Sequence, residues 1–210
     1  MSELIYIKRL EEDQIEEASG VAGRAFQDDP LFVYCCPDPI ERKNMSNVAC
    51  ENMILAGILS GEVYITSNTI EGIAVWHPVG EINKISRNQS KEIIRRSRRV
   101  RREMNSDSLF MERYGIFTEI IVQFHNKYID FPHWYLSIIG VDPAYQGKGY
   151  GSKLLKMKLA EIDEQKLPCY LHTENEKNIH FYEQFGFEVV DKAVIPNSEL
   201  KAWAMIRKRK

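Results

Sequence analysis

A glycine-rich turn directly after a strand-like segment is the feature that most restricts how this chain folds. Residues 133–141, HWYLSIIGV, read as a β-strand, and the following VDPAYQGKGYGS places Gly147, Gly149 and Gly151 within five positions. Glycine costs about 0.5–1 kcal/mol inside regular structure, so this cluster indicates a backbone that another group approaches closely. A strand, a glycine turn and a helix together aim several backbone N–H groups at one point, where the helix dipole adds positive charge. The segment therefore predicts an anion site, and phosphate is the usual guest.

Two common phosphate-binding motifs do not fit this turn. A P-loop requires G-x-x-x-x-G-K followed by Ser or Thr, whereas Lys148 is followed by Gly149. The dinucleotide fingerprint G-x-G-x-x-G would place Ser152 or Leu154 at its third glycine. The pattern that fits is Q-x-x-G-x-G, formed by Gln146, Gly149 and Gly151.

Two segments together resemble a known family. IGVDPAYQGKGYGSKLL is similar to the acetyl-CoA-binding core of the GNAT superfamily of N-acetyltransferases. Downstream, TENEKNIHFYEQFGFEVV resembles that family's signature N-x-x-A/N-x-x-x-Y-x-x-x-G-F. The resemblance spans residues 133–190 and is greatest to the branch that contains puromycin-type antibiotic acetyltransferases. The first 130 residues support it only through the order of their elements.

The resemblance implies acetyl-CoA as co-substrate and assigns residues to it. Backbone N–H groups of the glycine turn would hold the pyrophosphate, backbone groups of the preceding strand would pair with pantetheine, and one strand amide, for which Gly140 is suited, would serve the thioester carbonyl. Two asparagines would contact CoA, although Asn175 also fits an N-cap and Asn178 also fits a solvent-facing position. The alternative is a tight turn without a ligand. The implied cofactor-binding residues are Ile139, Gly140, Val141, Gln146, Gly147, Lys148, Gly149, Tyr150, Gly151, Ser152, Asn175 and Asn178.

Catalytic candidates follow from the same resemblance. Tyr182 stands where the family's tyrosine donates a proton to the CoA thiolate; the alternative is a core aromatic residue. An alkylamine has a pKa of about 10.4, so a base must accept its proton directly or through water. Glu174, the preferred candidate, and His172 end the strand beside the expected thioester position, and His133 and Glu119 are alternates. Each of them also fits a structural role. No metal-ligand spacing is present, so we expect no metal.

The chain as a whole reads as a mixed α/β fold with a largely antiparallel sheet flanked by helices. We expect one GNAT-like domain over residues 1–210, with its acetyl-CoA core at about 133–190. A helical insertion at about 81–130, before the fourth strand, would cover the acceptor side. Strands are expected at 4–10, 62–67, 72–78, 133–141 and 169–173 with two more at the end, and helices at 12–26, from Pro30, and at 40–60, 84–104, 107–128, 149–165 and 175–185. Asp29, directly before Pro30, is the predicted N-cap of the short helix that begins there.

The segment 84–104 carries nine basic and two acidic residues. Its non-ionic residues Ile93, Ser97, Val100 and Met104 recur at helical spacing, so the arginines read first as a solvated helix face. The alternatives are an acidic partner or substrate, or nucleic acid. Three functions therefore remain open: N-acetylation of a small amine, acetylation of protein lysines or N-termini, and nucleic-acid binding through this segment.

Composition, net charge and cysteine spacing indicate where in the cell this chain works. The net charge of −2 provides no general attraction to nucleic acid or to a membrane surface. No apolar stretch approaches the roughly 20 residues that span a bilayer, and the first residues lack a secretory signal pattern. Four cysteines, Cys35, Cys36, Cys50 and Cys169, have neither zinc nor redox spacing and are expected to be reduced and mostly buried. We therefore expect a cytoplasmic enzyme.

Overall fold

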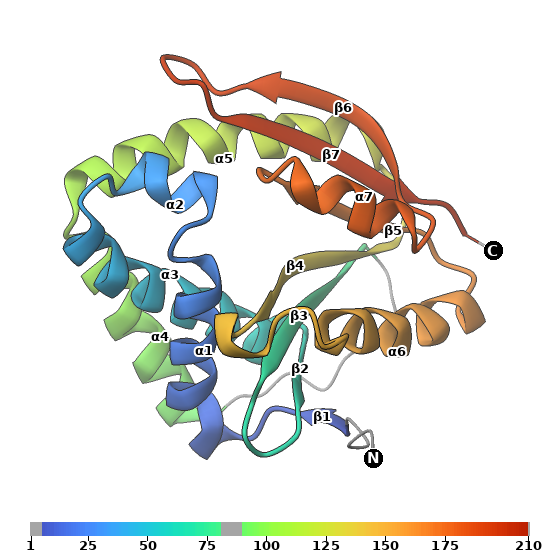
Figure 1. The fold of residues 1–210 in the computed structure, drawn as a ribbon, viewed down its shortest axis with the longest axis horizontal. Coiled ribbons are helices and arrows are strands. Elements are labelled where there is room, and N and C mark those ends of the chain that lie inside the picture. The colour runs from blue at the N-terminus through green and yellow to red at the C-terminus, as the bar shows by residue number, and fades with distance from the viewer. Residues whose placement is uncertain (1–5, 81–89, 210) are drawn as a thin grey trace.

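A single seven-stranded sheet organises the chain in the computed structural model, which describes residues 6–80 and 90–209 (Figure 1). Its strand order is β1-β2-β3-β4-β5-β7-β6. Neighbouring strands are antiparallel except for β4 and β5, which are parallel. This confirms the predicted mixed, largely antiparallel sheet. The strands are β1 (Ile7–Arg9), β2 (Glu62–Thr66), β3 (Gly72–Val79), β4 (His133–Val141), β5 (Cys169–Thr173), β6 (Glu188–Val194) and β7 (Lys201–Arg207).

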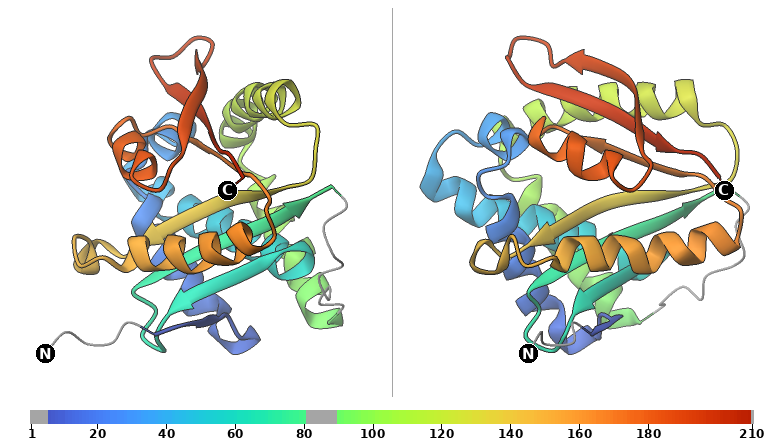
Figure 2. Two further views of the ribbon diagram at one scale, coloured as in Figure 1. Left: turned by 90° about the vertical axis from the view of Figure 1, so that its right-hand side faces the viewer. Right: turned by 45° about the vertical axis from the view of Figure 1, so that its right-hand side comes forward.

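Helices cover both faces of the sheet. Figure 2 shows α6 on one side of β2–β4 and α3 with α4 on the other, while α5 runs along β6 and β7. Aspartate side chains begin several of these helices: Asp29, followed by Pro30, accepts the N–H of Leu31, as its sequence predicts for an N-cap. The helices are α1 (Ile15–Phe26), α2 (Pro30–Cys35), α3 (Pro39–Ser60), α4 (Lys91–Met104), α5 (Ser108–Tyr128), α6 (Tyr150–Glu164) and α7 (Lys177–Glu183).

Two of these helices, α4 and α5, lie between β3 and β4, where the helical insertion was expected. The buried residues of α4 are Ile93, Ser97, Val100 and Met104, which confirms the predicted apolar face. Residues 81–89, which the predictions assigned to the insertion and the start of the basic helix, lie outside the described residues, as do residues 4–5 of the predicted first strand. Within the described part of the chain, no helix combines the length and the apolar character needed to cross a bilayer.

A bulge in β4 changes which face of the sheet its side chains reach. Leu136 pairs with Trp76 and Ile138 pairs with Val75, so Ser137 has no partner in the register. Side chains two residues apart on a regular strand share a face. Here Leu136 packs with α6, whereas Ile138 joins the core on the opposite side, beneath α1 and α3. The bulge therefore re-aims every side chain in the second half of β4.

The parallel strands β4 and β5 separate soon after they meet. They pair only at Trp134 with Cys169 and at Tyr135 with Tyr170. Beyond this point the strands carry no mutual ladder, and the sheet opens toward the C-terminal ends of both (Figure 1). The glycine turn and α7 follow these two ends in the chain. The opening therefore lies beside the segments that carry the sequence signatures.

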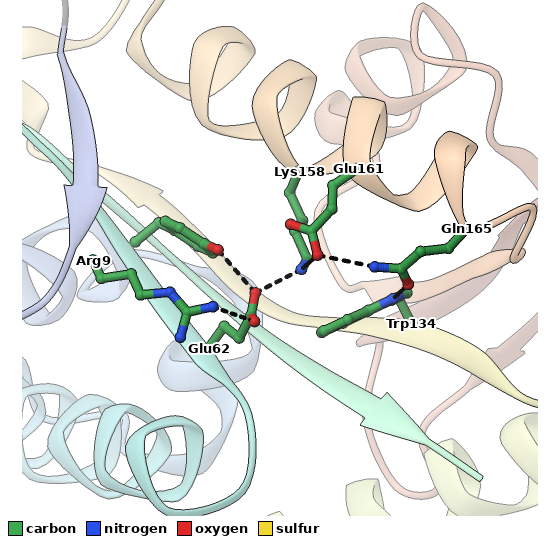
Figure 3. A network of polar contacts seen from close by, with 7 residues as sticks. Arg9, Glu62, Trp134, Lys158, Glu161 and Gln165 are labelled. Atoms are coloured by element: carbon green, nitrogen blue, oxygen red, sulfur yellow. Dashed lines mark hydrogen bonds and ion pairs between the residues drawn. The ribbon is translucent and has the colours of Figure 1, made fainter. Parts of the chain in front are cut away.

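A buried ion network fixes α6 to the sheet (Figure 3). The side chain of Lys158 is fully buried. Its Nζ atom lies 2.6 Å from Oε2 of Glu62 and 3.6 Å from the ring centre of Trp134. Glu62 also accepts hydrogen bonds from the hydroxyl of Tyr64 and from Arg9. Several charge-assisted contacts thus tie the helix that begins at the glycine turn to β1 and β2.

Candidate active site

The glycine turn leaves an open space at the start of α6. Gly147 and Gly149 have φ values of +76° and +85°, which non-glycine residues rarely adopt. A Cβ atom at either position would have no heavy atom within 4 Å, so the protein does not fill the space beside them. Gly149 is the N-cap of α6, and the N–H groups of Gly151 and Ser152 lie in its first turn. Such first-turn N–H groups have no acceptor inside the helix, so this end of α6 suits an anion.

Side chains of the turn hold the loop itself. The amide nitrogen of Gln146 donates to the backbone oxygen of Val141 at 3.1 Å. The ammonium group of Lys148 donates to the backbone oxygen of Ala144 at 3.3 Å. Both side chains therefore support the conformation of the turn, whose backbone is left to face the open space.

The end of β4 is anchored to α1. A Cβ atom on Gly140 would lie 3.1 Å from Cβ of Ala25 and 3.0 Å from Cε2 of Phe26, so this glycine permits a close approach of the helix. Arg24 forms an ion pair with Asp142 at 2.6 Å. Partial burial opposes ionisation of Asp142, but hydrogen bonds from the Ala144 N–H and from Arg24 hold its pKa below the ordinary value.

A groove of about 790 Å³, here called the glycine groove, runs over these segments. Its lining includes every cofactor-binding residue predicted from the sequence except Lys148. Asn175 lies in this lining, and its Oδ1 atom accepts the N–H of Lys177 at 3.2 Å, whereas the N-cap residue of α7 is Glu176 and not Asn175. The structure thus brings together residues of β4, the turn, α6 and α7. They are Ile139, Gly140, Val141, Gln146, Gly147, Gly149, Tyr150, Gly151, Ser152, Asn175 and Asn178.

A second space of about 490 Å³, here called the inner cavity, lies in the opening between β4 and β5. Helix α5 supplies much of its wall, whereas no residue of α4 lines either space. Its polar side chains include Asp29, His125, His172 and Glu174. Its aromatic side chains are Phe26, Phe32, Tyr114, Phe117, Tyr135, Tyr170 and Tyr182.

The two spaces share five residues, here called the junction: Phe26, Asp29, Ile139, Asn178 and Tyr182. A molecule in the glycine groove and another in the inner cavity would therefore meet at this point. Tyr182 is 7% exposed, and it lines both spaces. Burial, followed by the charges of Glu174 and Asp29, raises the pKa of Tyr182, which keeps the phenol protonated.

The four candidate bases differ in whether they line the inner cavity. Glu174 and His172 both line the inner cavity, with Oε1 of Glu174 2.9 Å from Nδ1 of His172. The other ring nitrogen of His172 lies 2.7 Å from the hydroxyl of Tyr135. By contrast, His133 is buried behind the cavity, where burial lowers its pKa, and Glu119 is exposed on α5. Neither His133 nor Glu119 lines the inner cavity or the glycine groove.

Asp29 is a further candidate residue of the site, although its place before Pro30 predicts only a helix cap. Its Oδ1 atom does accept the N–H of Leu31 at 3.0 Å, yet the side chain also belongs to the junction. Burial, with a contribution from Glu174, raises the pKa of Asp29 to about 7. No sequence pattern distinguishes such an aspartate from an ordinary cap. Within residues 6–80 and 90–209, no group of His, Cys, Asp and Glu side chains could hold a metal ion.

Comparison with known proteins gives a consistent result. The sequence profile of the acetyltransferase (GNAT) domain matches residues 112–189. An uncharacterized N-acetyltransferase of Schizosaccharomyces pombe is 31% identical over 188 residues, covering 86% of this chain and 73% of that protein. One solved structure from Corynebacterium glutamicum, "histone acetyltransferase HPA2 and related acetyltransferase", superposes on this chain with a TM-score of 0.65 at 19% identity. The match covers 100% of this chain and 98% of the other. The structure of arylalkylamine N-acetyltransferase 2 from Aedes aegypti superposes with a TM-score of 0.62 at 13% identity, covering 99% of this chain and 100% of the other. At these identities the two solved structures share the fold.

Proposed function

This chain belongs to the GNAT family of N-acetyltransferases, and we propose that it transfers the acetyl group of acetyl-CoA to a primary amine of a small molecule. The observation that carries the proposal is the junction, where the glycine groove meets an aromatic inner cavity beside Tyr182. Two such spaces sharing one point are what a direct transfer between two bound substrates requires.

The glycine groove is proposed to bind acetyl-CoA. The N–H groups of Gly151 and Ser152 hold the pyrophosphate, with Gly147 and Gly149 leaving room for it. The second half of β4, which lacks a partner strand on the β5 side, pairs with the pantetheine arm through Ile139, Gly140 and Val141. One of these amides polarises the thioester carbonyl. Asn178 on α7 and Asn175 in the loop before it contact the cofactor.

The chemistry requires three proton transfers, two from the acceptor nitrogen and one to the departing sulfur. The acceptor enters mainly as an ammonium ion, and Glu174 accepts its proton, so that the free amine can attack the thioester carbon. The C–N bond forms, the C–S bond breaks, and Tyr182 donates its hydroxyl proton to the departing sulfur. The attacking nitrogen then carries one proton more than the amide, and the phenolate of Tyr182 takes it back, so that the phenol is restored, while Glu174 releases its proton to water. A phenol is a weak acid relative to a thiol, so the position of Tyr182 at the junction matters more than its acidity.

A small acceptor fits the shape of the inner cavity. About 490 Å³ walled by α2, α5 and aromatic side chains lies within the range of small-molecule pockets. Acetylation of protein lysines or N-termini is the alternative, which requires an extended segment to reach the junction. A nucleic-acid role for α4 is less favoured, because Arg96 and Arg99 pair with Glu51 and the helix borders neither space. Membership of the puromycin-type branch stays a prediction. A cytoplasmic location also stays a prediction, and the four free cysteines are in keeping with it.

An acceptor screen tests the proposal. The protein is incubated with acetyl-CoA and either small primary amines or peptides with free lysines and N-termini, and released CoA thiol is measured. We expect turnover with small amines and little with peptides. Turnover confined to peptides would support the protein-acetylating alternative. Salt-dependent binding to DNA or RNA without any thiol release would support the nucleic-acid alternative.

A further inference from the structure

We propose that Asp29 binds the ammonium group of the acceptor at the junction and thereby selects amines that arrive as cations. The inference rests on the proposed function, because it concerns the acceptor of the same reaction. It assigns to Asp29 a task separate from proton removal by Glu174. Asp29 holds the nitrogen, and Glu174, in the adjoining inner cavity, takes the proton directly or through a water molecule.

The location of Asp29 is the first support. Of the two carboxylates in the inner cavity, only Asp29 also lines the glycine groove, as Tyr182 does. Glu174 lines the inner cavity alone. The reacting nitrogen has to lie where the two spaces meet, so Asp29 is the carboxylate placed to contact it.

The surroundings of Asp29 are the second support. Its Oδ1 atom accepts the N–H of Leu31, and no ion pair with Lys or Arg involves Asp29 among the described residues. Phe26, Phe32 and Tyr114 contribute aromatic surface to the same cavity. A carboxylate in such surroundings is costly unless a cation joins it, and aromatic faces favour a cation as well. An organic ammonium ion satisfies both requirements.

The proposal implies a pH dependence of acceptor binding. Groups that influence or face Asp29 are Glu174 and His172 at the end of β5, Tyr182 on α7 and Cys50 on α3. Burial first, and Glu174 second, raise the pKa of Asp29 to about 7. Below that pH the carboxyl is protonated and neutral, and above it the carboxylate can pair with an ammonium ion. Affinity for a cationic amine should therefore fall as the pH drops through about 7.

The test compares two isomeric probes. 2-Phenylethylamine is a cation at neutral pH, whereas 4-ethylaniline has the same atoms and a nearly equal volume but is neutral. Calorimetry measures the binding of each to the CoA-saturated protein, for the wild type and for Asp29→Asn. Asparagine is an equally good N-cap, so the variant removes the charge while keeping the start of α2.

We expect Asp29→Asn to weaken 2-phenylethylamine binding by about 10- to 100-fold, the usual effect of losing a hydrogen bond between charged groups. Binding of 4-ethylaniline should change by less than about threefold, and the pH dependence of 2-phenylethylamine binding should disappear in the variant. Equal changes for both probes, no change for either, or no binding of 2-phenylethylamine to the wild type would overturn the inference. Charge-selective binding without acetyl transfer to any amine would instead overturn the proposed function and leave the role of Asp29 standing.

Discussion

The Nδ1 atom of His172 lies 2.9 Å from the Oε1 atom of Glu174 at the end of β5. The opposite ring nitrogen of His172 lies 2.7 Å from the hydroxyl of Tyr135. In a neutral imidazole one nitrogen donates a hydrogen bond and the other accepts one. An ionised Glu174 can only accept, so Nδ1–H donates a hydrogen bond to Glu174 and the hydroxyl of Tyr135 donates one to Nε2. The chain of three groups fixes the Glu174 carboxylate at the wall of the inner cavity.

Replacement of Glu174 by glutamine should lower kcat. The amide keeps the size and one hydrogen bond to His172 but cannot accept the proton of the amine, and general base catalysis is typically worth about 10²–10⁴-fold. The matched control is Glu119→Gln, because Glu119 is exposed and lines neither space. Steady-state kinetics at saturating acetyl-CoA measure both. Equal kcat in the two variants would remove Glu174 from the mechanism.

Replacement of Tyr182 by phenylalanine should lower turnover by about 10²–10⁴-fold, because the departing thiolate loses its proton donor. The ring packing with Phe181 and Phe187 is retained, so melting temperature and CoA affinity should change little. A purely structural tyrosine predicts the reverse pattern, a lower melting temperature with near-normal turnover per folded molecule. Measuring all three quantities on one variant decides between these roles.

Replacement of Gly151 by alanine should weaken CoA binding without unfolding the protein. The new Cβ would lie 3.6 Å from Cγ2 of Val141, an ordinary contact, yet it would occupy space at the wall of the glycine groove. Gly149 is a poorer test because its φ of +85° strains any side chain. Gly115→Ala is the control, since a Cβ there meets nothing within 4 Å and the residue lies mid-helix in α5. Both variants should melt at or above the wild-type temperature, and only Gly151→Ala should raise the Kd for CoA, by about tenfold or more.

Replacement of Lys158 by methionine should destabilise the fold by about 3–5 kcal/mol, because Glu62 would keep a buried charge without its main partner. The exposed Lys156 on the same helix provides the control, and Lys156→Met should stay within about 0.5 kcal/mol of the wild type. Denaturant unfolding measures the free energy of each. Unchanged stability of Lys158→Met would show that the network does not hold α6 to the sheet.

Local patterns in the sequence predicted the elements well. Asp29 before Pro30 predicted the start of a helix, and the spacing of Ile93, Ser97 and Val100 predicted the buried face of α4. The glycine turn was predicted because positive φ angles and open space at a helix start leave their mark in residue type. Each of these features depends on neighbours along the chain.

The acceptor side of the site depends on contacts that the sequence does not express. Asp29 and Tyr182 are 153 positions apart and share the junction only because β4 and β5 separate. The bulge at Ser137 turns the second half of β4 over, which no pattern in WYLSIIG indicates. His133 and Glu119 were candidates by residue type alone, and the packing of β4 and α5 directs both away from the inner cavity.

Isothermal titration calorimetry with acetyl-CoA tests the central claim most directly. The failed P-loop and dinucleotide patterns beside the open glycine groove predict saturable one-to-one binding of acetyl-CoA and of CoA, together with a higher melting temperature at saturation. NAD and ATP should neither bind measurably nor shift the melting temperature. Saturable binding of NAD with no heat from acetyl-CoA or CoA would contradict the account.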